Sequence, residues 1–160
     1  MRAAVDGLVR TQPDSTQVGR LRAYLCLVRL AKQDVVGARA ECAASLRALR
    51  AVAGPDSPHE IWTLTLSGQV ELADHRFIEA VTFLERAAAL AVAGNVRSIE
   101  AATAQGYYAI ALLRAKRTTQ ARAVAVKIAP ALRAAELAET RREFVQAFPE
   151  LTQAATPSPP

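Results

Sequence analysis

The sequence is poor in the residues that most often build a β core or a reactive site. Only 5% of its 160 residues are aromatic, and it holds two cysteines and two histidines. Alanine and leucine dominate a composition that is 51% hydrophobic, and these residues favour packed helices over strands. A chain of this length can bury a core without metal or disulfide links. We therefore expect an all-α domain or a short array of helical repeats.

Long hydrophobic runs and catalytic motifs are also missing. The longest purely apolar run covers residues 87–93, far short of a membrane span, and residues 1–10 contain no apolar signal core. No phosphate-binding loop or dinucleotide fingerprint occurs. His59 and His75 have no cysteine or carboxylate at metal-ligand spacing. We expect a cytoplasmic protein that is not an enzyme and that binds no cofactor and no metal.

Positive charge is in excess but is not concentrated. The formal net charge is +5, and the arginines are scattered among glutamates without a dense Lys/Arg block. This distribution favours a solvated surface. Nucleic-acid binding through arginine-bearing helices, with Arg20, Arg22 and Arg29 on one of them, is an alternative that predicts strongly salt-dependent affinity.

Residues 54–94 carry the clearest pattern, that of a helical hairpin. Ser57, Pro58 and Glu60 predict a capping box at the start of a helix over residues 58–73. Asp74 is a candidate cap for a second helix. The second helix should cover residues 76–92 and end at Gly94 and Asn95, which tolerate positive φ. Its apolar residues recur at helical spacing and predict one buried face: Phe77, Ala80, Val81, Leu84, Ala87 and Ala88.

Small residues within this hairpin predict how its two helices meet. Gly68 lies near the middle of the first helix, where glycine costs roughly 1 kcal/mol relative to alanine. Such a residue usually has a packing reason. We expect the partner helix to approach closely there, with Ala80 and Ala87 presenting equally small surfaces.

Two more hairpins with similar spacing flank this one. Before it, Asp14 or Ser15 should start a helix that runs to about residue 32, and Asp34 should cap a second helix over residues 35–52. After it, we expect helices over residues 96–114 and 119–137. Ala38, Ala80 and Ala121 recur at separations of 42 and 41 residues, which is typical of a stacked helical array. Cys26 and Ala109 take the position of Gly68 in their hairpins. The key pairs are thus Cys26/Ala38, Gly68/Ala80 and Ala109/Ala121.

The two cysteines and the chain ends complete the prediction. We expect Cys26 and Cys42 to be buried thiols, with a disulfide between them as a geometrically possible alternative. Pro130 should kink or break the last hairpin near Ile128. A final helix over residues 139–148 should cap the stack, and residues 2–11 form a further candidate helix. We expect a domain over residues 1–148 and a flexible proline-rich tail over residues 149–160.

The order Leu64, Gly68, Leu72, Phe77, Ala80, Leu84, Ala87 resembles the tetratricopeptide repeat. The long period and the linker Gly54-Pro55-Asp56-Ser57-Pro58-His59 resemble the kinesin-light-chain type, as found in bacterial regulators and at the C-termini of bacterial Ser/Thr kinases. The resemblance covers roughly residues 15–137. It implies a right-handed α-solenoid of about three hairpins that acts as a scaffold or adaptor for protein–protein interaction.

The resemblance also implies a binding surface, because the first helices of such hairpins line a concave groove. Its expected residues are Arg20, Tyr24, Leu27, Trp62, Thr65, Gln69, Thr103, Tyr107, Ile110 and Arg114. Amphipathic aromatics and arginines are enriched at binding hot spots, and arginine can hold a carboxylate. We expect a partner protein or peptide in this groove. The alternatives are a homodimer formed through the alanine- and leucine-rich end of the stack, and packing roles for the aromatic residues.

Overall fold

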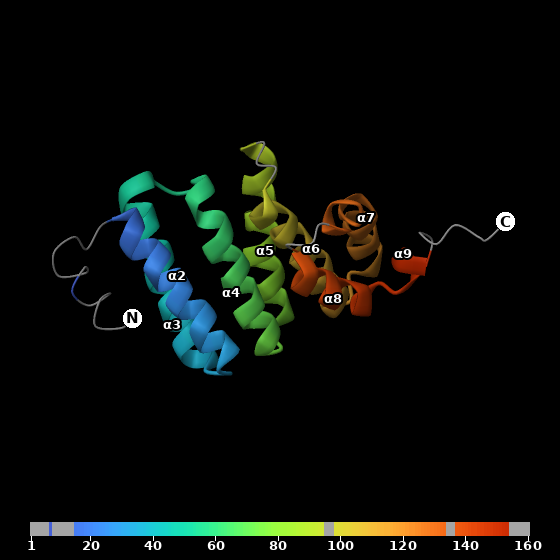
Figure 1. Ribbon diagram of the computed structural model, residues 1–160, viewed down its shortest axis with the longest axis horizontal. Coiled ribbons are helices and arrows are strands. Elements are labelled where there is room, and N and C mark those ends of the chain that lie inside the picture. The colour runs from blue at the N-terminus through green and yellow to red at the C-terminus, as the bar shows by residue number, and fades with distance from the viewer. Residues whose placement is uncertain (1–6, 8–14, 95–97, 134–136, 154–160) are drawn as a thin grey trace.

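The computed structural model describes residues 7, 15–94, 98–133 and 137–153. The described part contains helices and no strand, and it forms an α-solenoid of three hairpins (Figure 1). The hairpins are α2 (Thr16–Ala31) with α3 (Val35–Ala53), α4 (Ile61–Ala73) with α5 (Phe77–Ala93), and α6 (Ile99–Arg114) with α7 (Thr118–Ile128). The predicted all-α array is confirmed. The helix predicted over residues 2–11 lies outside the described residues, apart from Gly7.

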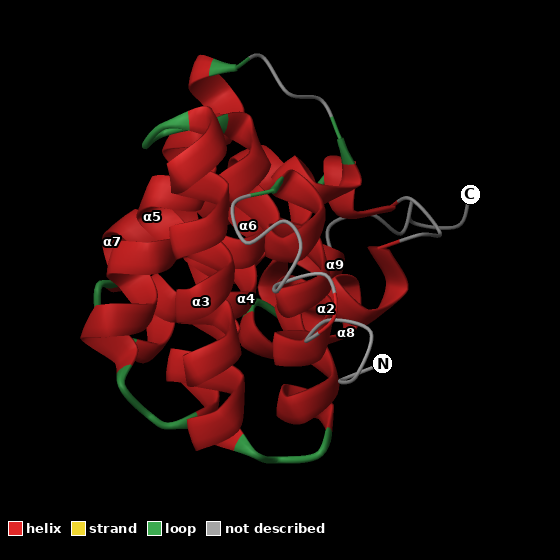
Figure 2. Ribbon diagram, turned by 90° about the vertical axis from the view of Figure 1, so that its left-hand side faces the viewer, coloured by secondary structure: helices red, strands yellow, loops and turns green. Residues whose placement is uncertain are grey.

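The helices form two layers. Figure 2 shows the second helices of the hairpins, α3, α5 and α7, on one side of the molecule, with α2 on the opposite side. The chain advances along the stack from α2 to α7, so each hairpin contacts the next (Figure 1). Across the described ranges, no helix has the length and apolar character needed to cross a membrane.

Three helices begin with a side-chain cap. The hydroxyl of Ser15 accepts a hydrogen bond from the Val18 amide, and the Asp34 carboxylate accepts one from the Gly37 amide. These caps fix the starts of α2 and α3 where the sequence predicts them. Ser98 caps α6 in the same way, so this helix begins three residues later than expected.

The three turns inside the hairpins share one geometry. Gln33, His75 and Lys116 adopt left-handed backbone conformations, with φ of 61°, 58° and 62°. In each turn the amide of the following residue bonds the carbonyl five residues back, as between Asp34 and Arg29. A helix end closed by this pattern of backbone hydrogen bonds is the Schellman motif. These three left-handed residues recur with the period of the repeat, and two more, Gly54 and Asp56, lie in the linker between the first two hairpins. α5 ends at Gly94 as expected, but Gly94 has a φ of −79° and does not use a positive φ.

The expected cap at Asp74 is also wrong. Asp74 ends α4, and α5 begins after Arg76 with no side-chain cap. The Asp74 carboxylate instead accepts a hydrogen bond from the Arg39 guanidinium on α3, at 2.6 Å. The reason is the turn geometry, since the Schellman motif already satisfies the end of α4 and leaves this carboxylate free to pair with a neighbouring helix.

The linker between the first two hairpins ends in a short 3-10 turn, η1 (Pro58–Glu60). Ser57 caps this turn, but Glu60 does not close the predicted capping box. Its carboxylate is fully buried and accepts hydrogen bonds from the Asp56 amide and from Arg50 on α3, the latter at 2.9 Å. Arg86 of α5 lies 3.4 Å from the same carboxylate. The buried Glu60 thus ties the linker to both neighbouring helices.

The predicted small residues are buried, as the close packing of the helices requires. Ala38, Ala80, Ala109 and Ala121 have no exposed surface. The contact at Gly68 differs from the expectation, because a Cβ there would clash with the side chain of Leu84, not with an alanine. Leu84 is one helical turn beyond Ala80 and fills the space that glycine leaves.

The same pair of positions in the first hairpin holds a disulfide. Cys26 corresponds to Gly68 and Cys42 to Leu84, and the two sulfurs are bonded, with the Cα atoms 5.3 Å apart. The prediction of buried thiols is therefore wrong, although both residues are buried. The close approach of the helices that we inferred for Gly68 brings two cysteines within bonding distance when both positions carry them.

The last hairpin ends at the predicted break. α7 stops at Ile128, two residues before Pro130, and the turn η2 (Ala131–Arg133) follows. Two further helices complete the described chain, α8 (Ala138–Ala147) and α9 (Glu150–Gln153), the latter within the stretch expected to be tail. α8 packs mainly on α6 and η2. Phe144 and Phe148 are buried there, and Gly106 of α6 lies close to Thr140. Because α8 lies on a first helix, it also bounds the surface described next.

Candidate functional site

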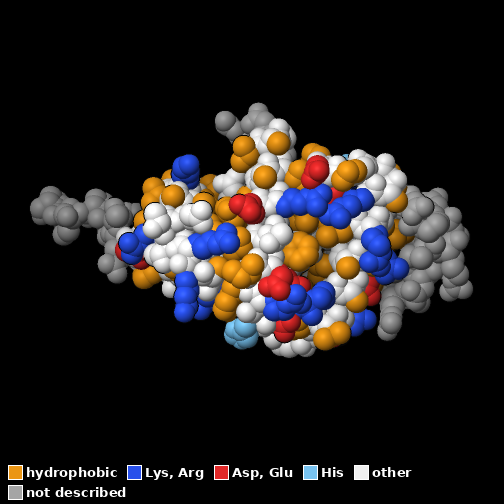
Figure 3. All heavy atoms as spheres, turned by 180° about the vertical axis from the view of Figure 1, so that it is seen from behind, with side chains coloured by type: hydrophobic (Ala, Val, Ile, Leu, Met, Phe, Trp, Pro, Cys, Tyr) orange, Lys and Arg blue, Asp and Glu red, His pale blue; other side chains and the backbone are white. Residues whose placement is uncertain are grey.

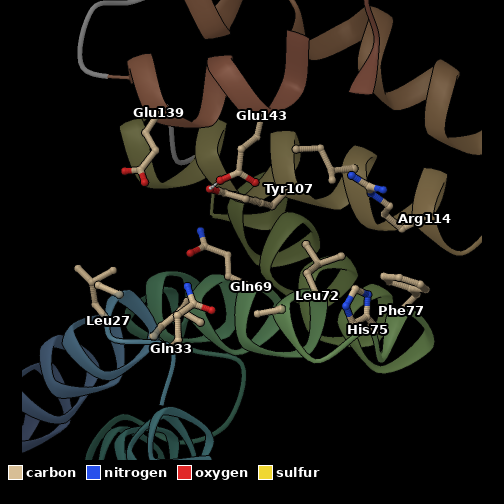
Figure 4. Close-up of a pocket in the computed structure, with 14 residues that line it drawn as sticks. Leu27, Gln33, Gln69, Leu72, His75, Phe77, Tyr107, Arg114, Glu139 and Glu143 are labelled. Carbon is tan, nitrogen blue, oxygen red and sulfur yellow. Dashed lines mark hydrogen bonds between the residues drawn. The ribbon is translucent and has the colours of Figure 1, made fainter. Parts of the chain in front are cut away.

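A hollow lies where the first helices of all three hairpins meet α8. We call it the groove pocket. It has a volume of about 460 Å³ and is lined by α2, α4, α6 and α8 with the turns after α2 and α4 and the start of α5 (Figure 4). This volume is in the range of small-ligand and side-chain pockets. The pocket exists because the first helices of the hairpins, α2, α4 and α6, lie side by side in the stack, and α8 closes one side.

The groove pocket is lined by apolar residues, which we call its apolar floor, and by polar residues. Its apolar residues are Leu27, Leu30, Ala31, Leu72, Ala73, Phe77 and Ile110. Its polar residues are Gln33, Gln69, His75, Tyr107, Arg114, Glu139 and Glu143. Figure 4 shows Arg114 and His75 toward one end, Glu139 toward the other and Glu143 between them, beside Tyr107. A bound group would therefore meet opposite charges at the two ends.

One hydrogen bond holds the wall of the groove pocket together. The buried Tyr107 on α6 donates its hydroxyl hydrogen to Oε1 of Glu143 on α8, at 2.9 Å. Burial raises the pKa of Tyr107 well above its ordinary value, and the carboxylates of Glu143 and Glu139 raise it further. The phenol therefore stays neutral and remains a donor, which fixes α8 against α6.

A second hollow of about 210 Å³ surrounds Trp62 near the other end of the first helices. Arg20 of α2 and Glu100 of α6 line it together with Trp62. The pKa of Glu100 lies below its ordinary value because of a hydrogen bond with Ser98 and its own backbone, with a smaller effect of Arg20. The Tyr24 ring meets Trp62 edge-on, with centroids 4.6 Å apart. We call this hollow the Trp62 pocket.

Seven of the ten residues expected in one groove line these two hollows. Five line the groove pocket: Leu27, Gln69, Tyr107, Ile110 and Arg114. Arg20 and Trp62 line the Trp62 pocket, and Tyr24 packs on Trp62. Thr65 is buried and donates its hydroxyl hydrogen to the Ile61 carbonyl, so it does not reach the surface. Thr103 bonds the Ile99 carbonyl in the same way and lines neither hollow.

The sequence analysis missed the contribution of α8 and of the turns. Glu139 and Glu143 are one helical turn apart, opposite the buried Phe144, and this spacing was visible in the sequence. Gln33 and His75 enter the groove pocket because their turns follow the helices that line it. What the sequence could not show is that α8 folds back onto α6, which decides that its glutamates face the groove.

The opposite face, formed by α3, α5 and α7, carries mixed charge. Figure 3 shows its Lys and Arg side chains in several separate groups, with Asp and Glu between them. Several of these arginines form ion pairs, including Arg50 with Glu60, Arg76 with Glu79 and Arg86 with Asp56. This pattern is that of a solvated face. The described ranges also hold no group of three or more side chains placed to bind a metal ion.

The tetratricopeptide repeat family model matches residues 19–93. The match covers the first two hairpins, from the first turn of α2 to the end of α5. The third hairpin repeats their turn geometry and their small buried positions. None of the curated proteins compared with the chain matches it. The matched family supports an α-solenoid whose repeats generally serve protein–protein interaction.

Proposed function

We propose that this chain is a noncovalent interaction module, a scaffold or adaptor of the long-period repeat type, that binds a segment of a partner protein in the groove pocket. The observation that carries the proposal is the pocket itself, an apolar hollow with polar ends that spans the first helices of all three hairpins. No chemical step is needed for this function, and we propose no enzymatic activity.

The residues that line the groove pocket indicate the chemistry of the partner segment. The floor of the groove pocket, with Leu27, Leu72 and Phe77 among its residues, suits an aliphatic side chain. Gln33 and Gln69 offer amide donors and acceptors at its edge, which suit the backbone of an extended or helical peptide. We therefore propose a peptide with at least one large apolar residue next to polar ones.

The rigidity of the surface favours binding. Gly68 and Ala109 let the helices approach closely, and the Schellman turns fix the ends of the lining helices. A surface that is already ordered loses little conformational entropy when a partner binds. The stack thus contributes to affinity without touching the ligand.

Two adjacent residues on α2 provide a matched test. Leu27 and Val28 are 39% and 38% exposed, but only Leu27 lines the groove pocket. Peptides would be selected from a random display library on the wild-type protein, and their Kd measured by fluorescence anisotropy. Leu27→Ser should weaken binding by about 1 kcal/mol, roughly fivefold, because it removes apolar contact area. Val28→Ser should leave the Kd unchanged.

Each outcome decides the proposal. Equal effects of the two substitutions would place the binding surface elsewhere, and a library that yields no binder would end the proposal. Light scattering of the same samples tests the homodimer, since a mass that doubles with concentration supports self-association instead. Binding to a polyanion that falls steeply with salt would favour the nucleic-acid alternative.

A further inference from the structure

Two carboxylates of the groove pocket lie on α8, and one of them also accepts a hydrogen bond within the fold. Glu139 and Glu143 are four residues apart on α8, so they lie on one face of the helix. Figure 4 shows both on the side of α8 that faces α4 and α2. Both side chains are exposed and both line the pocket. The same face of α8 therefore presents two negative charges to the hollow.

Among the described residues, no ion pair includes either glutamate, whereas Glu41, Glu60 and Glu71 each form one. Two like charges one turn apart repel each other and disfavour the helix. One oxygen of Glu143 accepts the Tyr107 hydrogen bond. Within the described part of the chain, the other Glu143 oxygen and both Glu139 oxygens accept none, so three acceptor atoms are open to a ligand.

The surroundings of these carboxylates favour a long cationic side chain. The apolar floor of the same pocket, with Leu27 and Leu72, can cover a methylene stem. A guanidinium presents several N–H donors in one plane and can bond carboxylates in pairs. Arg114 lies toward the opposite end of the pocket (Figure 4) and would repel a cation there. Charge complementarity thus selects the α8 end.

We propose that Glu139 and Glu143 bind the guanidinium of an arginine in the partner segment, with its stem on the apolar floor. This inference rests on the proposed function and adds the chemistry of the occupant. The arginine offsets one of the two negative charges on α8 and so reduces their repulsion, and the neutral Tyr107 holds Glu143 in place for it. A partner with glutamate at this position is excluded by repulsion.

The test uses the library-selected peptides as probes. We expect arginine to be enriched at one position of the selected sequences. Replacing that arginine with citrulline, which keeps the shape and loses the charge, should weaken binding to the wild type about tenfold, as expected for losing a hydrogen bond to a charged group. On Glu139→Gln/Glu143→Gln the two peptides should bind almost equally.

A matched control separates this pocket from carboxylates in general. Glu85 accepts a hydrogen bond from Tyr108 at 3.0 Å, as Glu143 does from Tyr107, but Glu85 lies outside the pocket. Glu85→Gln should keep the full preference for arginine over citrulline. Circular dichroism would verify that all variants are folded.

The outcomes distinguish this inference from the function on which it rests. Peptides that bind at Leu27 but show no preference for arginine, or a preference that survives Glu139→Gln/Glu143→Gln, overturn the inference and leave the interaction module standing. A preference lost equally in Glu85→Gln overturns it as well. A library without binders overturns both.

Discussion

The junction between the first two hairpins and the junction between the last two use equivalent positions but different chemistry. At the first junction, Arg39 of α3 donates two hydrogen bonds to the carboxylate of Glu71 on α4, at 2.8 and 3.0 Å. The carboxylates of Glu71 and Asp74 raise the pKa of Arg39 above its ordinary value. Nearby, the buried hydroxyls of Ser45 and Thr63 lie 3.0 Å apart.

At the second junction the same places are apolar. One repeat further along, Val81 takes the position of Arg39 and Leu112 that of Glu71, and both belong to one buried core cluster. Ala87 and Ala104 take the positions of Ser45 and Thr63, and both have no exposed surface. At these equivalent positions the first junction therefore uses directed polar contacts and the second uses apolar packing.

The interiors of the first two hairpins differ in the same way. The disulfide between Cys26 and Cys42 stands where Gly68 and Leu84 pack in the second hairpin. The disulfide and the Gly68–Leu84 contact are both buried, and each holds two antiparallel helices close together. The repeat thus fixes the space available at each position, while the chemistry that fills it varies along the stack.

The largest expected effect tests the packed hairpin. Leu84→Ala removes a fully buried side chain from its contact with Gly68, and the cavity should lower the free energy of unfolding by about 2–5 kcal/mol. Urea unfolding followed by circular dichroism measures it. Ile78→Ala, at a 57% exposed position of the same helix, should change stability by less than about 0.5 kcal/mol. A loss as small for Leu84→Ala would contradict the packing role.

The disulfide of the first hairpin should have an effect of intermediate size. Its cysteines are 16 residues apart, and closing a loop of this length contributes about 3 kcal/mol. Urea unfolding with and without dithiothreitol should show this difference for the wild type. Cys26→Gly/Cys42→Leu transplants the residues of the second hairpin and should fold with a stability that dithiothreitol does not change. If the oxidised and reduced wild-type proteins were equally stable, the disulfide would not stabilise the fold.

The ionic junction should show the smallest net effect. Arg39→Val/Glu71→Leu installs the residues of the second junction, and such replacements of buried ion pairs are often neutral or stabilising. We expect a change within about 1 kcal/mol. Arg39→Val alone should cost more, because it leaves the buried Glu71 with only Arg76, at 3.5 Å. Thermal unfolding of the four proteins of this double-mutant cycle gives the coupling energy. If the single variant is as stable as the double, the pair does not act as a unit.

Much of the fold was predictable because its signals are local. The caps at Ser15 and Asp34, the break before Pro130 and the period of the small buried residues each follow from a few residues. The site was less predictable. Leu27, Gln69 and Arg114 were expected on the concave side and line the groove pocket, but whether a partner binds them is still a prediction. Thr65 was expected in the groove but is buried, because neighbouring positions on a helix can face the groove or the core.

The remaining features depend on contacts between segments far apart in the chain. Asp74 pairs with Arg39 on another hairpin instead of capping its own helix. Cys26 and Cys42 are bonded because two antiparallel helices bring them together. Glu139 and Glu143 enter the pocket only because α8 folds back onto α6.

The sequence by itself determined that the chain forms three helical hairpins, since helix caps, helical spacing and small residues act within one or two helices. Only the tertiary structure decided which chemistry joins the hairpins and where the groove pocket closes. The physical reason is that an ion pair, a disulfide or a pocket wall requires two surfaces in fixed relative positions, and in this protein packing between helices sets those positions.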